Sequence, residues 1–187
     1  KKTFQNFIDK TPSFGKSFVC IDDINVRSVL KQCKTRNFLT YGFHKYSNYQ
    51  IVNAKKGKNF SKFDLKIKIS GKKNRIIKNF QLNLLGNHNI KNATAAIALA
   101  LNLGINIRII SKAIKKFMGI QRRFTKIFSL QEKDFYDDYA HHPTEIACLL
   151  KGVQEVHNDR KIIAIFQPHR YSRVGSLKKE FAESFKL

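Results

Sequence analysis

The sequence predicts an α/β fold, and three observations support that prediction. Short apolar runs typical of buried strands alternate with segments of helical periodicity, both before residue 43 and again after residue 121. Between these regions, residues 50–69 show the strict alternation of a half-buried hairpin. Hydrophobic residues make up 42% of the chain, which is enough for a folded core despite the charge. Strands and helices that alternate at both ends of a chain are typical of the α/β class.

The first elements follow from local pattern. The apolar run SFVCI at 17–21 predicts a buried strand, and Asp22 and Asp23 then provide an N-cap for a helix that reaches Gln32. The aromatic and β-branched run at 37–43 predicts a second strand. These elements form the start of a sheet.

A hairpin and two helices are expected next. Within 50–69 the KKGKN sequence at 55–59 supplies the turn, and FQLNL at 80–84 predicts another strand. The NHN tripeptide after Gly86 offers caps for an Ala-rich helix that Gly104 stops, and a second amphipathic helix covers 107–119.

The second half of the chain has a different pattern. RRFTKIFSL and KDFYDDYA predict strands, and Pro143 opens a helix at its first turn. KIIAIFQP at 161–168 is almost wholly apolar, as in a buried parallel sheet, and a last helix is expected from about Ser176. The change of pattern near Gly119 predicts two partial domains, residues 1–119 and 120–187.

The net charge of +23 allows two interpretations. Binding to nucleic acid or to an anionic membrane is one of them. The other is amino-acid drift in an A/T-rich genome, since Lys outnumbers Arg, and Asn, Ile and Phe are abundant. The lysines are scattered along the chain, whereas phosphate-binding proteins tend to cluster them, so we favour drift. We therefore expect neither a nucleic acid nor a membrane partner, beyond a weak attraction for anionic nucleotides.

Other bulk features indicate a cytoplasmic protein. No apolar run approaches the roughly 20 residues that span a bilayer, and the first residues do not resemble a signal peptide. Cys20, Cys33 and Cys148 are odd in number and form no CxxC motif, which fits a reducing compartment and supports neither structural zinc nor a disulfide framework. The oligomeric state stays open.

Residues 13–18, SFGKSF, only superficially resemble a phosphate-binding loop. The motif requires a glycine five positions before the glycine of its GK pair, and Lys10 occupies that position. With Pro12 and the single Gly15, the segment offers no run of backbone N–H groups. We do not expect it to bind phosphate.

Two polar stretches suit a nucleotide. Asn89 and Asn92 are three residues apart at a helix start, so both amides project from one face beside the positive end of the helix, although plain capping is the alternative. Arg122 and Arg123 follow a helix-ending glycine, and in a strand only one of them would face a given ligand. A guanidinium suits phosphate, and a solvated pair is the alternative.

The densest polar stretch is DDYAHHPTE at 137–145. It ends a predicted strand, which is where open α/β sheets place ligands. In extended backbone Asp137 and Asp138 point to opposite sides, as do His141 and His142, so a single metal held by all four is disfavoured. We expect one Asp and one His to face a ligand while the other two are structural.

FQPHRYSR at 166–173 follows the next predicted strand. Arg170 and Arg173 are three residues apart, within reach of one carboxylate or phosphate. Together with 137–145, this stretch would form a crevice for a small anionic substrate.

Taken together, GNHNIKN, GIQRRF, DDYAHHPTE and FQPHRYSR resemble the ordered motif set of the Mur ligases, over nearly the whole chain. The resemblance implies the C-terminal part of a Mur-type central ATPase domain, followed by the start of a Rossmann-like C-terminal domain. It also implies cytoplasmic synthesis of peptidoglycan precursors, on which cell shape and division depend. ATP would phosphorylate a substrate carboxylate, and an amine would attack the acyl phosphate to give an amide, ADP and phosphate.

The resemblance assigns roles on the nucleotide side. His88, Asn89 and Asn92 resemble the helix start that contacts adenine. Arg123 resembles the arginine that reaches the ATP phosphates, and Asp138 resembles the carboxylate that positions the nucleotide. ATP is thus an expected ligand, together with Mg²⁺, whose ligands would lie in parts of the family pattern that this sequence lacks.

On the side of the amino acid, Tyr139, His141, Arg170 and Arg173 resemble the groups around an incoming alanine and its carboxylate. Arg123, Asp138 and His141 are the residues expected to be catalytic. The motifs favour the branch that adds L-alanine to UDP-N-acetylmuramate, and those two compounds with ATP are the expected partners. Because the family's phosphate loop and UDP-substrate domain are missing, we expect no ligase activity from residues 1–187 alone.

Three alternatives stay open. A related ligase that recycles murein tripeptide shares the HN…N and DD(Y/F)AHHPT motifs, although RRF and QPHRYSR favour alanine addition. A basic nucleic-acid-binding module depends on charge alone, and most Phe residues here lie in apolar strand patterns instead of exposed stacks. A metal-dependent hydrolase would require a stoichiometric metal at 137–142.

Overall fold

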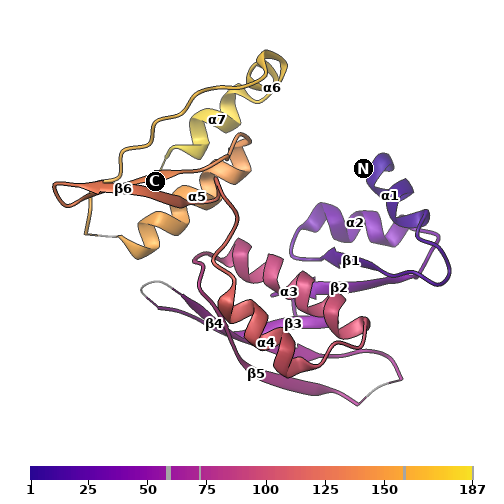
Figure 1. The fold of residues 1–187 in the computed structure, drawn as a ribbon. Helices are drawn as coiled ribbons and strands as arrows, with labels where there is room; N and C mark the ends of the chain where they lie inside the picture. The colour runs from indigo at the N-terminus through magenta and orange to yellow at the C-terminus, as the bar shows by residue number, and fades with distance from the viewer. Residues whose placement is uncertain (58–59, 72, 158, 187) are drawn as a thin grey trace. The chain divides into compact units, whose positions relative to one another are not determined.

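The computed structural model describes residues 1–57, 60–71, 73–157 and 159–186, which form two compact units, Lys1–Phe117 and Met118–Leu187 (Figure 1). The first unit contains, in chain order, α1 (Lys2–Asp9), β1 (Ser17–Cys20), α2 (Ile24–Gln32), β2 (Phe38–Gly42), β3 (Tyr49–Lys56), β4 (Ser61–Ile67), β5 (Arg75–Leu82), α3 (Asn87–Asn102) and α4 (Ile107–Lys116). The second contains β6 (Thr125–Leu130), β7 (Lys133–Asp137), α5 (Pro143–Val156), α6 (Tyr171–Ser176) and α7 (Lys178–Ser184). The predicted α/β class is confirmed.

The first unit is a mixed sheet with helices on both faces. Its strand order is β1-β2-β3-β4-β5, with β1, β2 and β3 parallel and the β3–β4–β5 pairs antiparallel. Neighbouring residues of β1 point to opposite faces, so Val19 packs with α1 and α2 whereas Phe18 packs on the side of α3. In Figure 1, α3 and α4 lie along the sheet, and α4 contacts β5. The main core is buried between these two helices and β3–β5.

A side chain replaces part of the backbone ladder between β2 and β3. These strands are parallel although only residues 43–48 connect them, far fewer than the dozen or so residues of a usual crossover. Asn48 compensates: its Oδ1 accepts from Thr40 N at 2.9 Å, and its Nδ2 donates to Lys68 O at 2.8 Å. One amide therefore joins β2 to the segment after β4.

The carboxyl ends of β1 and β2 are locked together by Asp22. Its Oδ1 accepts from His44 N at 2.9 Å. Gly42 has φ +137°, and a Cβ there would lie 2.3 Å from the same oxygen. Only glycine meets both requirements at position 42.

Most predicted boundaries of the first unit are confirmed within a few residues. Asp23 caps α2 by accepting from Asn25 N and Val26 N, and the predicted hairpin is β3–β4, although turn residues 58–59 lie outside the described residues. The N-terminal helix α1 was not predicted. The NHN prediction was wrong, because α3 starts at Asn87 after Gly86, whose φ of +92° places it outside the helix, and the cap makes no side-chain hydrogen bond.

The second unit has a smaller core. Ile146, Leu150 and Phe181 are its buried hydrophobic side chains among the described residues, and they join α5 to α7. The β6–β7 hairpin pairs only with itself within the described part of the chain. No described helix in either unit is long and apolar enough to cross a membrane.

The predicted buried strand at 161–168 is wrong. The segment has no ladder partner among the described residues, and Ile163 and Ile165 are 76% and 96% exposed. Ile162 and Phe166 do pack against the core of the second unit, and the Phe166 ring stacks on that of Phe181 at 5.5 Å. Apolar composition alone predicted a strand, but a strand also needs a neighbouring backbone to bind. The helical region after it starts at Tyr171 as α6, before the predicted Ser176, and continues as α7.

Candidate functional site

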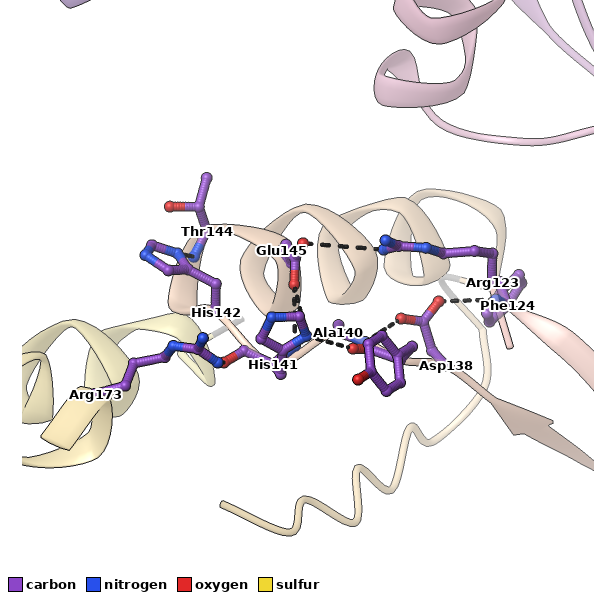
Figure 2. Close-up of polar contacts among 10 residues, drawn as sticks. Arg123, Phe124, Asp138, Ala140, His141, His142, Thr144, Glu145 and Arg173 are labelled. Carbon is purple, nitrogen blue, oxygen red and sulfur yellow. Dashed lines mark hydrogen bonds and ion pairs between the residues drawn. The ribbon is translucent and has the colours of Figure 1, made fainter. Parts of the chain in front are cut away.

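Asp138 accepts hydrogen bonds from both sides of the open end of the β6–β7 hairpin (Figure 2). Its Oδ2 accepts from Phe124 N at 2.8 Å, and its Oδ1 accepts from Ala140 N at 2.7 Å. Tyr139 N donates to Arg122 O at 2.8 Å, so backbone hydrogen bonding continues past the strands. The carboxylate therefore holds the segment before β6 against the segment after β7.

The two arginines diverge, although the predicted reason was wrong. They lie in a turn before β6, where Arg122 and Phe124 have positive φ, and strand alternation does not apply there. Arg122 Nε lies 3.4 Å from Asp137 Oδ2, and its guanidinium lies 4.9 Å from the Tyr139 ring centre. Arg123 instead points to α5.

The carboxylate of Glu145, on the first turn of α5, contacts both Arg123 and His141. Glu145 Oε1 lies 4.0 Å from Arg123 Nη1, and Oε2 accepts from His141 N at 3.0 Å. The His141 Nδ1 atom lies 3.6 Å from the same Oε2 and 2.9 Å from Tyr139 O. Sequence reasoning missed Glu145, although its position two residues after Pro143, in the first turn of the predicted helix, was an available signal.

The electrostatics of Glu145 reflect these contacts. Partial burial disfavours its charged form, but the backbone N–H groups of His141 and His142, the His141 imidazole and Arg123 favour it. The net effect lowers the pKa of Glu145 below its ordinary value. Glu145 is therefore an anion placed between two basic side chains.

His142 contacts the start of α5 through its side chain. Its Nδ1 accepts from Thr144 N at 3.3 Å and caps α5, whose first residue is Pro143. The partner of Asp137 is Arg122, which gives that carboxylate a structural contact too. All four side chains therefore contact protein groups, and which member of each pair faces a ligand stays a prediction.

Segments 137–145 and 166–173 converge at one point. Arg173 Nη1 donates to His141 O at 3.3 Å, as Figure 2 shows. Arg170 precedes α6 in a left-handed conformation, with φ +67°, and its side chain is exposed. Arg173 is therefore brought to the loop, whereas no contact of Arg170 with these residues is observed.

The start of α3, in the first unit, gathers the other predicted residues. Asn89 Nδ2 donates to Leu85 O at 2.7 Å, so this amide nitrogen closes the preceding turn, while Asn92 is exposed one turn later. The His88 ring lies over Gly86, where an added Cβ would approach Cε1 to 2.7 Å. No acidic residue lies in the first turn, which leaves the positive helix end suited to an anion.

The described residues include no group of three or more His, Cys, Asp or Glu side chains that could hold a metal ion. Asp137, Asp138, His141 and His142 each contact a different protein group.

Comparison with known proteins gives a consistent result. The Mur ligase middle domain matches residues 1–100, and the Mur ligase glutamate ligase domain matches residues 122–187. The chain is 54% identical over 186 residues to UDP-N-acetylmuramate–L-alanine ligase of Pelagibacter ubique, and the match covers 100% of this chain and 40% of that protein. The chain thus spans about two fifths of the length of the curated relatives it matches.

Solved structures agree. The crystal structure of UDP-N-acetylmuramate–alanine ligase MurC from Thermotoga maritima matches with a TM-score of 0.63 and 29% identity, over 88% of this chain and 40% of that one. A murein peptide ligase from Psychrobacter arcticus matches with a TM-score of 0.65 and 25% identity, over 90% of this chain and 34% of that one. The motifs, the two folded units and the family matches lead to one conclusion: the chain belongs to the Mur ligase family.

Proposed function

We propose that the chain is part of a cytoplasmic ligase that joins L-alanine to UDP-N-acetylmuramate, with ATP as the energy source, in peptidoglycan precursor synthesis. The observation that carries this proposal is identity of 54% along the whole chain to a ligase with that name. The geometry supports it, because Arg123, Asp138, His141 and Arg173 gather around one loop.

The reaction involves two anionic groups, the ATP phosphates and the alanine carboxylate, which must be bound separately. Phosphate transfer from ATP to the substrate carboxylate gives an acyl phosphate, whose carbonyl carbon the alanine amine attacks, and phosphate then leaves as the amide forms. In our proposal Arg123 contacts the phosphates, while Arg173 and Arg170 hold the alanine carboxylate and leave its amine free. Tyr139 and His141, whose rings meet edge to face at 5.1 Å, line the alanine side.

The adenine is assigned to the start of α3, through His88, Asn89 and Asn92. This assignment is supported by the exposure of Asn92, whose carboxamide can offer a donor and an acceptor to an adenine edge. Asp138 is assigned to nucleotide positioning. Because both of its oxygens already accept backbone hydrogen bonds, it would act by holding the turn that carries Arg122 against the loop that carries Tyr139.

A domain graft tests the proposal. Residues 1–187 would replace the matching segment of the Pelagibacter ubique ligase, and phosphate release would be measured with ATP, UDP-N-acetylmuramate and L-alanine. We expect release that requires all three compounds, and none from residues 1–187 alone. A graft that folds and yet releases no phosphate with L-alanine would contradict the proposal.

The alternative is a ligase that takes murein tripeptide. It is supported by the likeness to the Psychrobacter arcticus structure. The RRF and QPHRYSR motifs favour alanine, because they differ from the pattern of that relative. Competition between L-alanine and the tripeptide in the grafted enzyme separates the two, and a preference for the tripeptide would favour the alternative.

A further inference from the structure

We propose that Glu145 is a positioning residue, which sets Arg123 and His141 relative to each other through one carboxylate. The inference rests on the proposed function, in which Arg123 serves the nucleotide and His141 serves the amino acid. Glu145 itself touches neither ligand in this proposal.

The contacts of the two carboxylate oxygens carry the inference. Oε1 faces Arg123 Nη1 at 4.0 Å, and Oε2 both accepts from His141 N at 3.0 Å and faces His141 Nδ1 at 3.6 Å (Figure 2). Arg123 enters from the turn before β6, and His141 enters from the loop after β7. A single carboxylate on the first turn of α5 therefore contacts side chains from two separate segments.

Helix capping explains only part of this arrangement. A glutamate in the first turn commonly accepts a backbone N–H at the helix start, and the His141 N–H fits that role. Capping does not require Oε1 to face an arginine from another segment, nor Oε2 to face an imidazole. Partial burial with the lowered pKa of Glu145 indicates that the carboxylate is held as an anion among these groups.

The consequence for chemistry is one of orientation. The side chains of Arg123 and His141 are 51% and 33% exposed, so packing alone leaves them room to move. The Glu145 carboxylate between them restrains the Arg123 guanidinium and the His141 imidazole, so that each keeps its orientation. Misplacement of reacting groups by about 1 Å costs on the order of a hundredfold in rate.

The first test uses nuclear magnetic resonance on residues 1–187. Glu145→Gln keeps an oxygen that accepts from His141 N–H but removes the charge, and Glu183→Gln removes one charge from α7, where Glu183 pairs with Lys186. We expect E145Q to shift the side-chain signals of both Arg123 and His141 while amide protection in α5 is kept. Signals at both side chains that match those of E183Q would overturn the proposal.

The second test uses the grafted enzyme described above. We expect E145Q to raise KM for both L-alanine and ATP by roughly tenfold or more and to lower kcat, with E145D closer to wild type than E145Q. E183Q should leave all three constants unchanged. If E145Q matches E183Q while the wild-type graft turns over L-alanine, the positioning role fails and the proposed function stands.

If the wild-type graft is inactive with L-alanine, the proposed function fails, and the resonance measurement still decides whether Glu145 orients the two side chains. Glu145→Ala serves as the folding control, since it removes both the cap and the charge. Loss of α5 protection in E145A together with unchanged Arg123 and His141 signals in E145Q would reduce Glu145 to a helix cap and overturn the inference.

Discussion

The two units of this chain keep their shape by different means. In the first, Lys1–Phe117, a five-stranded sheet buries large side chains such as Phe63, Leu65 and Phe80 at 1% exposure or less. In the second, the described core is small, and the loop with the predicted site residues is held by hydrogen bonds to Asp138 and Glu145. The comparison shows that the loop with the predicted site residues depends on hydrogen bonds to carboxylates more than on apolar burial.

Charge divides the units as well. Up to Phe117 the sequence has 24 Lys and Arg against 4 Asp and Glu, and from Met118 it has 12 against 9. Basic residues are almost equally dense in the two units, 24 among 117 residues and 12 among 70, so the net charges of +20 and +3 differ largely because acidic residues are scarce in the first unit. Two acidic side chains of the second unit, Asp137 and Glu145, lie within 4.0 Å of Arg122 and Arg123.

The largest expected difference between the units comes from a matched pair of isoleucines. Ile97, in α3, is fully buried in the main core, whereas Ile163 is 76% exposed. We expect Ile97→Ala to cost about 2–5 kcal/mol and Ile163→Ala to stay within about 0.5 kcal/mol. Chemical denaturation of the two variants provides the measurement. A large loss in Ile163→Ala would show that the exposed segment packs against something in solution.

A pair of aspartates tests how much the hydrogen bonds to carboxylates stabilise each unit. Asp23 accepts from two N–H groups of its own helix start, whereas Asp138 accepts from Phe124 N and Ala140 N on either side of a hairpin. We expect Asp23→Ala to cost about 1 kcal/mol. Asp138→Ala should cost about 1–3 kcal/mol, because two partly buried N–H groups lose their acceptor.

Residue-resolved hydrogen exchange checks this prediction, because it reports each unit separately. We expect Asp138→Ala to speed exchange in β6, β7 and the loop to α5, while β1–β5 stay protected. Equal losses in both units would contradict a local fastening role.

Salt should separate the units by their net charge. Self-repulsion in the first unit is screened as the Debye length falls from about 30 Å at 0.01 M to about 8 Å at 0.15 M salt. We therefore expect sodium chloride to raise the melting temperature of the first unit by a few degrees and to change the second less. Fluorine-labelled probes at one Phe in each unit would follow the two transitions, and a larger gain in the second unit would refute this explanation.

Lowering the pH should have the smallest effect on the free energy of unfolding. The Asn53 amide lowers the pKa of Asp64 in the first unit, and the pKa of Glu145 in the second is lowered as well. Carboxylates with lowered pKa values stabilise the fold above their ordinary values, 3.8 for Asp64 and 4.5 for Glu145, and this contribution is lost as the pH falls through the folded-state values.

Because both groups are partly exposed, each contribution should stay within about 1 kcal/mol. Asp64→Asn and Glu145→Gln should be less stable than the wild type at pH 7, and the difference should vanish near pH 2. Urea unfolding at the two pH values measures it. A difference that persists at pH 2 would indicate lost packing and not lost charge.

Much of the fold and part of the site could be predicted from local pattern. Asp23 as a cap, Gly104 as a helix stop and Pro143 as a helix start each depend on neighbours within a few residues, and the structure confirms them. The strand at 161–168 failed because pairing depends on a distant backbone. The NHN cap failed because the conformation of Gly86 let α3 begin at Asn87.

The sequence by itself determined the family and the order of its motifs, because residue type and spacing carry that information directly.

Only the tertiary structure decided which side chains meet. Glu145 contacts Arg123 across 22 positions of sequence, and Arg173 reaches His141 across 32, so neither contact follows from helical or strand periodicity. Such pairs form when separate segments fold onto one helix start, and the chain's local preferences do not specify them. In this protein the candidate site residues could be identified in the sequence, but their mutual orientation depends on the tertiary fold.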